Sequence, residues 1–184
     1  MKGSRSKGTQ ERRASEANGL VLGFVLRFFA LVFLISVLAR VDLNVFEGAA
    51  SRALTHHSAW VVASTLSVFG ADVTQRGNTI VYQSSAFRVI EECTGIEVIG
   101  LFVAAILAFP SAWRHRLLGL ALGIPALLLL NLVRMVTLIL IGASSMKALD
   151  FSHVYVWPVI VLTMALGLWL HWARIAVRDP RTLV

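Results

Sequence analysis

Long apolar runs with few charges constrain this chain more than any other feature of its sequence. They occupy residues 20–39, 117–142 and 154–176, and a shorter run covers residues 96–110. The shorter run reaches about 18 residues when it is counted from Cys93, and a transmembrane helix needs about 20 mostly apolar residues. The sequence therefore predicts an all-α integral membrane protein with about four transmembrane helices.

The composition supports a membrane bundle and argues against a water-soluble domain. Hydrophobic residues make up 57% of the chain and charged residues 15%, whereas soluble domains carry about 45–50% apolar and about 25% charged residues. A soluble globule of this composition would expose large apolar patches. The net charge of +7 comes from basic residues just beyond the apolar runs, where such residues orient helices and contact anionic lipids. We therefore expect the lipid bilayer, and no nucleic acid, as a partner.

The two ends of the chain are expected to be tails around one membrane domain. Residues 1–19 are polar and basic, which predicts a disordered cytoplasmic tail. Residues 178–184 follow the last apolar run and predict a second, short cytoplasmic tail. Residues 20–177 then form a single membrane domain.

The segment between the first two apolar runs is not expected to span the membrane. Residues 48–69 predict an amphipathic helix that lies on or dips into the outer surface, because Arg52, His56 and His57 make this segment a poor spanning candidate. Turn signals at Gly70 and Gly77 then border β-prone stretches at 79–82 and 87–90. These features predict a small extracytoplasmic β-hairpin or three-stranded meander.

The distribution of basic residues predicts which side of the membrane each loop faces. With a cytoplasmic N-terminus and four spans, the inner segments 1–19, 111–116 and 171–184 hold ten Lys and Arg residues, and the outer segments 40–92 and 143–153 hold five. Cytoplasmic loops carry the excess of Lys and Arg. This orientation is therefore favoured over a fifth span at residues 49–71, which would reverse all later segments.

Under this orientation three chemically distinctive residues converge near the outer surface. Cys93 begins the second span and His153 begins the fourth. Arg134 lies in the third span, about 12 Å below its outer end at a rise of 1.5 Å per residue, which a long guanidinium side chain pointing outwards can bridge.

Cys93 precedes a predicted helix start that would favour its nucleophilic form. Thr94 and Glu97 fit a capping box, with Thr94 as the N-cap. The unpaired N–H groups and the positive end of the helix dipole would then favour the thiolate and could hold an oxyanion. The nearby glutamates oppose the thiolate, so a cation must outweigh them, and Arg134 is the candidate.

Arg134 interrupts an apolar helix, where a charge costs about 2.5–3.5 kcal/mol at the membrane centre. Asn131 shares its helix face, so the two residues imply a polar pocket between helices, in which we expect Asn131 to position Arg134. The alternative is a structural clamp, in which Arg134 pairs with Glu92 or Glu97.

His153 is the best base candidate among the five histidines. His115 and His171 fall on the inner side, and the other two lie on the amphipathic segment. An interfacial histidine is often structural, but one at the same membrane level as a cysteine and an arginine is a candidate catalytic group. One cysteine allows no intramolecular disulfide, and the cysteine-rich zinc patterns are absent from the sequence. We therefore expect neither a metal nor a cofactor.

These residues resemble the motifs of the exosortase/archaeosortase family of membrane transpeptidases. The resemblance rests on Cys93-Thr94-Gly95, which fits a Cys-[Ser/Thr]-Gly motif, on Asn131-x-x-Arg134, and on His153 before the last helix, and it covers roughly residues 70–175. It implies a cysteine nucleophile that forms an acyl-thioester, assisted by Arg134 and His153.

The resemblance also implies the substrate and the site of action. Substrates would be exported proteins with a C-terminal signal made of a short motif, a transmembrane helix and a basic cluster. The enzyme would cleave this signal at the extracytoplasmic side of the plasma or inner membrane and transfer the protein to a cell-envelope acceptor. The chain looks like a compact single-domain member of the family.

Two other functions remain open from the sequence. A membrane acyl or lipid transferase could use the same cysteine thioester without proteolysis. A non-catalytic membrane assembly protein could use Arg134, Asn131 and the glutamates only to hold helices together.

Overall fold

The computed structural model describes residues 3–45 and 48–178. The chain forms a helix α1 (Gly3–Val45), a helix α2 (Ala49–Val68), a three-stranded sheet, and then the helices α3 (Ile96–Ala108), α4 (Trp113–Ser144), α5 (Met146–Phe151) and α6 (Trp157–Arg178). The expected tail at 178–184 lies outside the described residues, apart from the last residue of α6.

The described residues contain three helices that are long and apolar enough to cross a membrane, rather than about four. They are Asn18–Val41, Trp113–Ser144 and Met146–Val177. The predicted second span forms only the 13-residue helix α3, about 20 Å long at 1.5 Å per residue. Phe109, the residue before Pro110, adopts an extended conformation (φ −69°, ψ 133°), because the ring of a following proline disfavours helical geometry. The all-α membrane architecture is confirmed, and the number of full-length spans is corrected.

The first helix begins much earlier than the apolar run that the sequence marks. Residues 3–19, for which the sequence predicts a disordered tail, are helical in the structure, since α1 starts at Gly3. Helix propagation adds one hydrogen bond for each residue ordered, and proline opposes it most strongly. No proline stands between Gly3 and the apolar run, so the helix can extend outwards from it.

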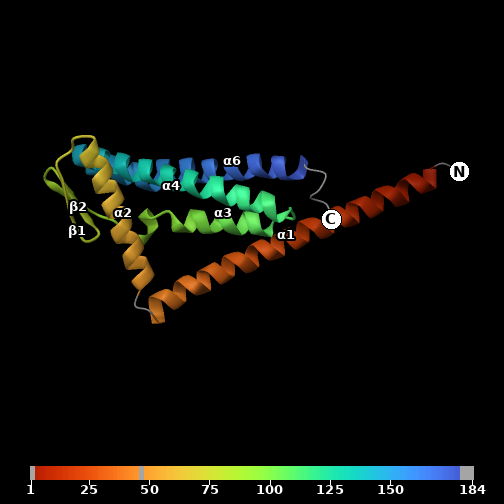
Figure 1. Ribbon diagram of the computed structural model, residues 1–184. Helices are drawn as coiled ribbons and strands as arrows, with labels where there is room; N and C mark the ends of the chain where they lie inside the picture. The colour runs from red at the N-terminus through yellow and green to blue at the C-terminus, as the bar shows by residue number, and fades with distance from the viewer. Residues whose placement is uncertain (1–2, 46–47, 179–184) are drawn as a thin grey trace.

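The helices α3, α4 and α6 run side by side, and α2 and the sheet lie together at one end of them (Figure 1). We call this the sheet end, and it also holds residues 89–95 and 143–153. The opposite end, which we call the loop end, holds residues 109–116 and 172–178. The helix α1 packs mainly against α3.

The sheet is an antiparallel meander, as the sequence predicts. Its strands are β1 (Val73–Arg76), β2 (Thr79–Tyr82) and β3 (Ser85–Arg88), in the order β1-β2-β3. Each hairpin has a two-residue loop, and Gly77 (φ 62°) and Gln83 (φ 52°) take the left-handed conformation that such loops require. The predicted strand at 79–82 is found at those residues, and the strand predicted at 87–90 is β3, which begins two residues earlier.

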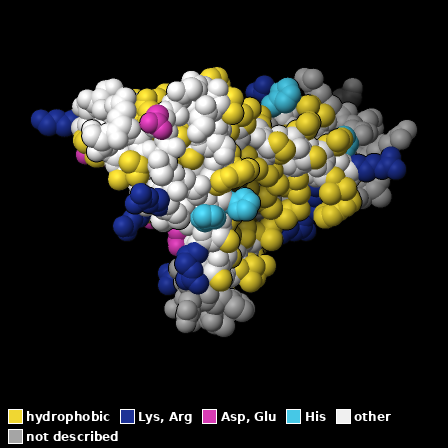
Figure 2. All heavy atoms as spheres, turned by 60° about the vertical axis from the view of Figure 1, so that its left-hand side comes forward, with side chains coloured by type: hydrophobic (Ala, Val, Ile, Leu, Met, Phe, Trp, Pro, Cys, Tyr) yellow, Lys and Arg dark blue, Asp and Glu magenta, His cyan; other side chains and the backbone are white. Residues whose placement is uncertain are grey.

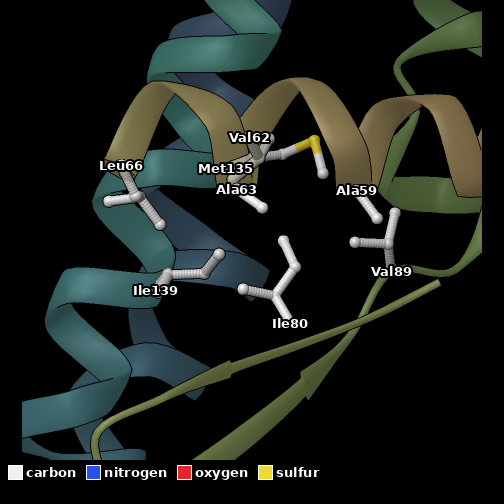
Figure 3. Packing of buried hydrophobic residues seen from close by; sticks show 8 residues of the cluster. All are labelled: Ala59, Val62, Ala63, Leu66, Ile80, Val89, Met135 and Ile139. Atoms are coloured by element: carbon white, nitrogen blue, oxygen red, sulfur yellow. The ribbon is translucent and has the colours of Figure 1, made fainter. Parts of the chain in front are cut away.

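The amphipathic helix expected at 48–69 is α2, and one of its faces packs on the sheet and α4. Figure 3 shows the resulting core, in which β2 and the segment after β3 contribute one side chain each. Tight packing of these apolar side chains fixes the sheet against the helical bundle. The core consists of Ala59, Val62, Ala63, Leu66, Ile80, Val89, Met135 and Ile139.

A second apolar cluster lies between α3, α4 and α6, and it includes Phe102, Leu127 and Trp172. Here the helices approach closely, because a Cβ atom at Gly123 would overlap the Phe102 ring and one at Gly119 would overlap the Trp172 ring. Many large apolar side chains on α1, α4 and α6 remain exposed, as expected for helix surfaces that face lipid.

Candidate active site

Cys93 lies in a short turn between the sheet and α3, and this turn is held by its own backbone. The turn is the single 3-10 turn η1 (Glu91–Cys93). The Cys93 N–H donates to the Ile90 carbonyl (3.0 Å) and the Thr94 N–H to the Glu91 carbonyl (2.9 Å). The half-buried Cys93 side chain is a free thiol.

The predicted capping box at Thr94 and Glu97 is wrong. The N-cap of α3 is Gly95, with φ 73° and no side-chain cap, because glycine takes this left-handed conformation without a steric penalty. The Thr94 hydroxyl instead donates to the Glu91 carbonyl (2.7 Å) and accepts a longer bond from the Ile96 N–H (3.4 Å). Thr94 therefore stabilises the cysteine turn, and α3 begins three residues after Cys93.

Asn131 on α4 stabilises the cysteine turn through a hydrogen bond to its backbone. Its buried amide donates from Nδ2 to the Cys93 carbonyl (2.9 Å). A Cβ atom at Gly95 would lie 2.9 Å from the Asn131 Cγ, so this position also needs glycine for the close approach. The sequence predicts that Asn131 positions Arg134, whereas the structure shows it bonded to the backbone of Cys93.

Arg134 lies one helical turn after Asn131 and contacts the peptide unit that precedes Cys93. Its Nη1 donates to the Glu92 carbonyl (3.4 Å). Among the described residues Arg134 forms no ion pair with Glu92 or Glu97, whose side chains are both exposed, and its buried Nε has no hydrogen-bond partner. Two successive turns of α4 thus bind the carbonyls on both sides of the Cys93 Cα atom.

His153 shares a cleft with Cys93. The cleft has a volume of about 290 Å³ and lies between β3 with the residues after it, α4, and α5 with the following turn. The His153 Nε2 is buried and has no partner in the part of the chain that the structure describes. Arg134 is not among the residues that line the cleft, which are Ala86, Phe87, Arg88, Val89, Ile90, Cys93, Met135, Leu138, Ile139, Met146, Leu149, Asp150 and His153.

His153 does not begin the last helix, as the sequence suggests, but lies inside it. The helix starts at Met146, because the Ser145 hydroxyl accepts from the Ala148 N–H (3.3 Å) as an N-cap. It then passes through the π-helical turn η2 (Ser152–Val156) into α6. Such π turns widen a helix locally and occur often at functional sites.

Sequence reasoning missed two charged residues at the cleft, Asp150 and Arg88. Asp150 lies three residues before His153, so helical spacing would place both on one face, but this signal appears only once the helix is known to begin before residue 150. Arg88 is exposed on β3. The other lining residues on α4 and α5 are apolar, so the cysteine and histidine face a mostly apolar space.

The remaining histidines are away from this cleft. The ring of His56 lies on α2, with its Nδ1 3.1 Å from the Gly77 carbonyl, and His115 and His171 are at the loop end. Figure 2 shows one face of the molecule, on which hydrophobic side chains gather in a broad patch with histidine side chains at its border.

Residues 17–170 match the family model described as transmembrane exosortase (Exosortase_EpsH). This range includes Cys93, Asn131, Arg134 and His153, together with the sheet and most of the helical bundle. Comparison with curated proteins and with solved structures gives no match.

Proposed function

The chain belongs to the transmembrane exosortase family, and on that premise we propose that it is a membrane-embedded cysteine transpeptidase. It cleaves the C-terminal sorting signal of exported proteins and transfers them to an acceptor on the cell envelope. The observation that carries the proposal is that Cys93 and His153 face one cleft while α4 binds the backbone on both sides of Cys93.

The proposed reaction begins with attack of the Cys93 thiolate on the carbonyl carbon of the scissile peptide bond. The carbonyl π electrons move to oxygen, which gives a tetrahedral oxyanion. The C–N bond then breaks, the leaving amine takes a proton from His153, and a thioester on Cys93 remains. The acceptor nucleophile attacks this thioester, loses its proton to His153, and releases Cys93 as a thiolate.

Arg134 is assigned the role of stabilising the negative charge that develops in this reaction. A guanidinium presents several N–H donors in one plane and keeps its charge in any protein environment. The Arg134 side chain already lies against the peptide unit before Cys93. Its charge can therefore stabilise the thiolate or the oxyanion.

Asn131 and His153 have separate roles in the proposal. Asn131 is a positioning residue, because its amide bonds the Cys93 carbonyl and so fixes the direction of the cysteine side chain. His153 lines the cleft beside Cys93, and its buried Nε2 has no partner among the described residues. Both observations support its role in proton transfer, since a catalytic role is one reason for an unsatisfied buried polar group.

The site is proposed to face the extracytoplasmic side. The excess of Lys and Arg in the segments at the loop end favours a cytoplasmic position for that end. The sheet end, with Cys93 and His153, then meets exported proteins after their translocation, while their C-terminal transmembrane helix is still in the bilayer.

The proposal is tested by following an exported, membrane-anchored protein with a C-terminal motif, transmembrane helix and basic cluster. Immunoblots should show a shorter form only when the wild-type chain is present. Cys93→Ala and Cys93→Ser should reduce this processing by about 10³-fold or more, because a serine hydroxyl lacks the acidity and nucleophilicity of the thiol. Membrane abundance of each variant is the control.

The two other functions give different results in the same cells. Radiolabelled lipid on the partner without a shorter form would indicate an acyl or lipid transferase. Normal processing with Cys93→Ala would indicate an assembly role and would remove Cys93 as the nucleophile.

A further inference from the structure

The strand β3 forms a free edge of the sheet, and its outward-facing backbone groups are unpaired. The order β1-β2-β3 leaves β3 with a neighbour on one side only. The Val89 N–H donates to the Asn78 carbonyl (2.8 Å), and residues 78 and 89 continue the register in which Thr79 faces Arg88. Hydrogen-bonded and non-hydrogen-bonded pairs alternate along an antiparallel ladder.

This alternation identifies the free groups. Phe87 and Ser85 form the hydrogen-bonded pairs with Ile80 and Tyr82, so their N–H and C=O groups point to β2. The N–H and C=O groups of Ala86 and Arg88 therefore point to the other side of β3. No other backbone hydrogen bond in the described part of the chain reaches these groups.

The free edge runs along the cleft that holds the cysteine. Ala86, Arg88 and the residues between and after them line the cleft together with Cys93 and His153. From the end of β3 the chain needs only the turn η1 to reach Cys93. The exposed groups of Ala86 and Arg88 repeat at about 6.6–6.8 Å, the two-residue spacing of an extended strand.

We propose that the substrate segment beside the scissile bond binds as a fourth strand on the free edge of β3. This inference rests on the proposed function and names how the same site holds its substrate. The backbone of the added strand pairs with Ala86 and Arg88, as in other cases of peptide recognition by strand addition. This pairing delivers a peptide carbonyl to Cys93, while the apolar wall of α4 and α5 meets alternate side chains of the substrate.

Binding through the backbone lets the site accept substrate segments of different sequence, which recognition of particular side chains would not allow. Each hydrogen bond depends on a peptide N–H or C=O, which nearly every residue supplies. Specificity then comes from the alternate side chains that face Leu138, Met146 and Leu149. An exposed edge is a liability for aggregation, and a short strand bearing the exposed Arg88 limits that risk.

The test measures how fast Cys93 is alkylated in the full-length protein in liposomes. Iodoacetamide reports the reactivity of the thiol alone. The peptide probe acetyl-tetra-alanine chloromethyl ketone adds an extended backbone, and it reacts when the Cys93 sulfur forms a bond to the methylene carbon and displaces chloride. The quantity compared is the rate of the peptide probe divided by the rate of iodoacetamide. This ratio should be higher for Cys93 in the wild-type protein than for the free thiol of glutathione.

Ala86→Pro removes the N–H that faces the cleft and leaves the ladder to β2 intact, since proline is tolerated where a strand N–H is unpaired. Relative to iodoacetamide, the peptide probe should then react about 2- to 13-fold more slowly, the change expected for one lost hydrogen bond. The matched control is Ala86→Val, which adds bulk but keeps the N–H, and the peptide probe should react faster with it than with Ala86→Pro.

N-methylation of the probe tests the pairing in the wild-type protein, without any variant. Methyl groups on the nitrogens that face β3 should slow labelling, and methyl groups on the alternate nitrogens should not. Equal sensitivity at every position, or equal peptide rates in Ala86→Pro and wild type, would overturn strand addition and leave the nucleophile assignment intact. Failure of both probes to label Cys93 would contradict the nucleophile and the pairing together.

Discussion

At both ends of the helical bundle, an arginine and one other side-chain donor on the helices bind backbone carbonyls, but only one end holds a candidate active site. At the loop end, Arg116 donates from Nη2 to the Phe109 carbonyl (3.0 Å), and Trp172 donates from Nε1 to the His115 carbonyl (2.7 Å). At the sheet end, Arg134 and Asn131 bind the carbonyls of residues 92 and 93 in the same way. Each arginine has a buried Nε that is unpaired in the described part of the chain.

The difference lies in what fills the space beside these bonds. At the loop end the Phe109 ring packs against the rings of Trp169 and Trp172, with centroids 5.9 and 5.6 Å away. At the sheet end the corresponding space is a cleft with a thiol and an unpaired imidazole. An arginine that binds a loop carbonyl thus stabilises the loop at both ends of the bundle. Only at the sheet end does a cleft with reactive side chains lie beside it. Arg116 is therefore an internal control for Arg134.

The largest expected difference between the ends is their accessibility from outside the cell. Cysteine reporters at Thr74, on the exposed face of β1, and at Trp113, exposed at the start of α4, are compared in a Cys93→Ala background. A membrane-impermeant maleimide on intact cells should label Thr74→Cys and should label Trp113→Cys only after permeabilisation. Labelling of Trp113→Cys in intact cells would place the cysteine turn in the cytoplasm.

The two arginines should respond differently to lysine. Arg134→Lys keeps the charge but loses the planar set of donors, so turnover should fall by about 10²–10³-fold, the cost of an oxyanion donor. Arg116→Lys should lower the thermal midpoint and leave turnover per folded molecule unchanged. Turnover is measured beside membrane abundance and thermal stability of both variants. Equal losses of turnover in the two variants, or activity that falls only in step with membrane abundance, would make Arg134 a structural clamp.

The two neutral donors offer a smaller contrast. Asn131→Leu and Trp172→Phe each remove one hydrogen bond to a loop carbonyl, which costs about 0.5–1.5 kcal/mol of stability. Both should lower the thermal midpoint by a few degrees, about 2–4 °C per kcal/mol for a chain of this size. Only Asn131→Leu should lower kcat, by about tenfold with KM unchanged, because a misdirected nucleophile impairs the chemical step. A kcat equal to that of Trp172→Phe would leave Asn131 a structural residue.

Features that depend on local chemistry or on the cost of burying charge were predictable from the sequence. The turn residue Gly77 and the β-prone residues around it indicate the meander, and the structure confirms it. Arg134 in an apolar helix must find a polar partner, and it does so beside Cys93. The positions of Cys93 and His153 near one end of the bundle follow from the order of the apolar runs, although His153 lies inside the last helix and not at its start.

Features that depend on backbone conformation or on distant contacts were not predictable. Thr94 and Glu97 satisfy the capping pattern, but Gly95 adopts a left-handed conformation that moves the helix start. The partner of Asn131 is a backbone carbonyl 38 positions away, and backbone groups leave no trace in the sequence. The cleft itself needs β3 and α5 to meet, and no short-range pattern encodes that contact.

The central claim is that substrate passes through a thioester on Cys93, and hydroxylamine tests it most directly. Its nitrogen attacks a thioester carbonyl and releases the thiolate, so it competes with the natural acceptor. Membranes that contain the wild-type chain and a processed substrate should yield a cleaved product with a C-terminal hydroxamate, detected by mass spectrometry, and Cys93→Ala membranes should yield none. Cleaved product without hydroxamate, formed equally well by Cys93→Ala, would contradict the account.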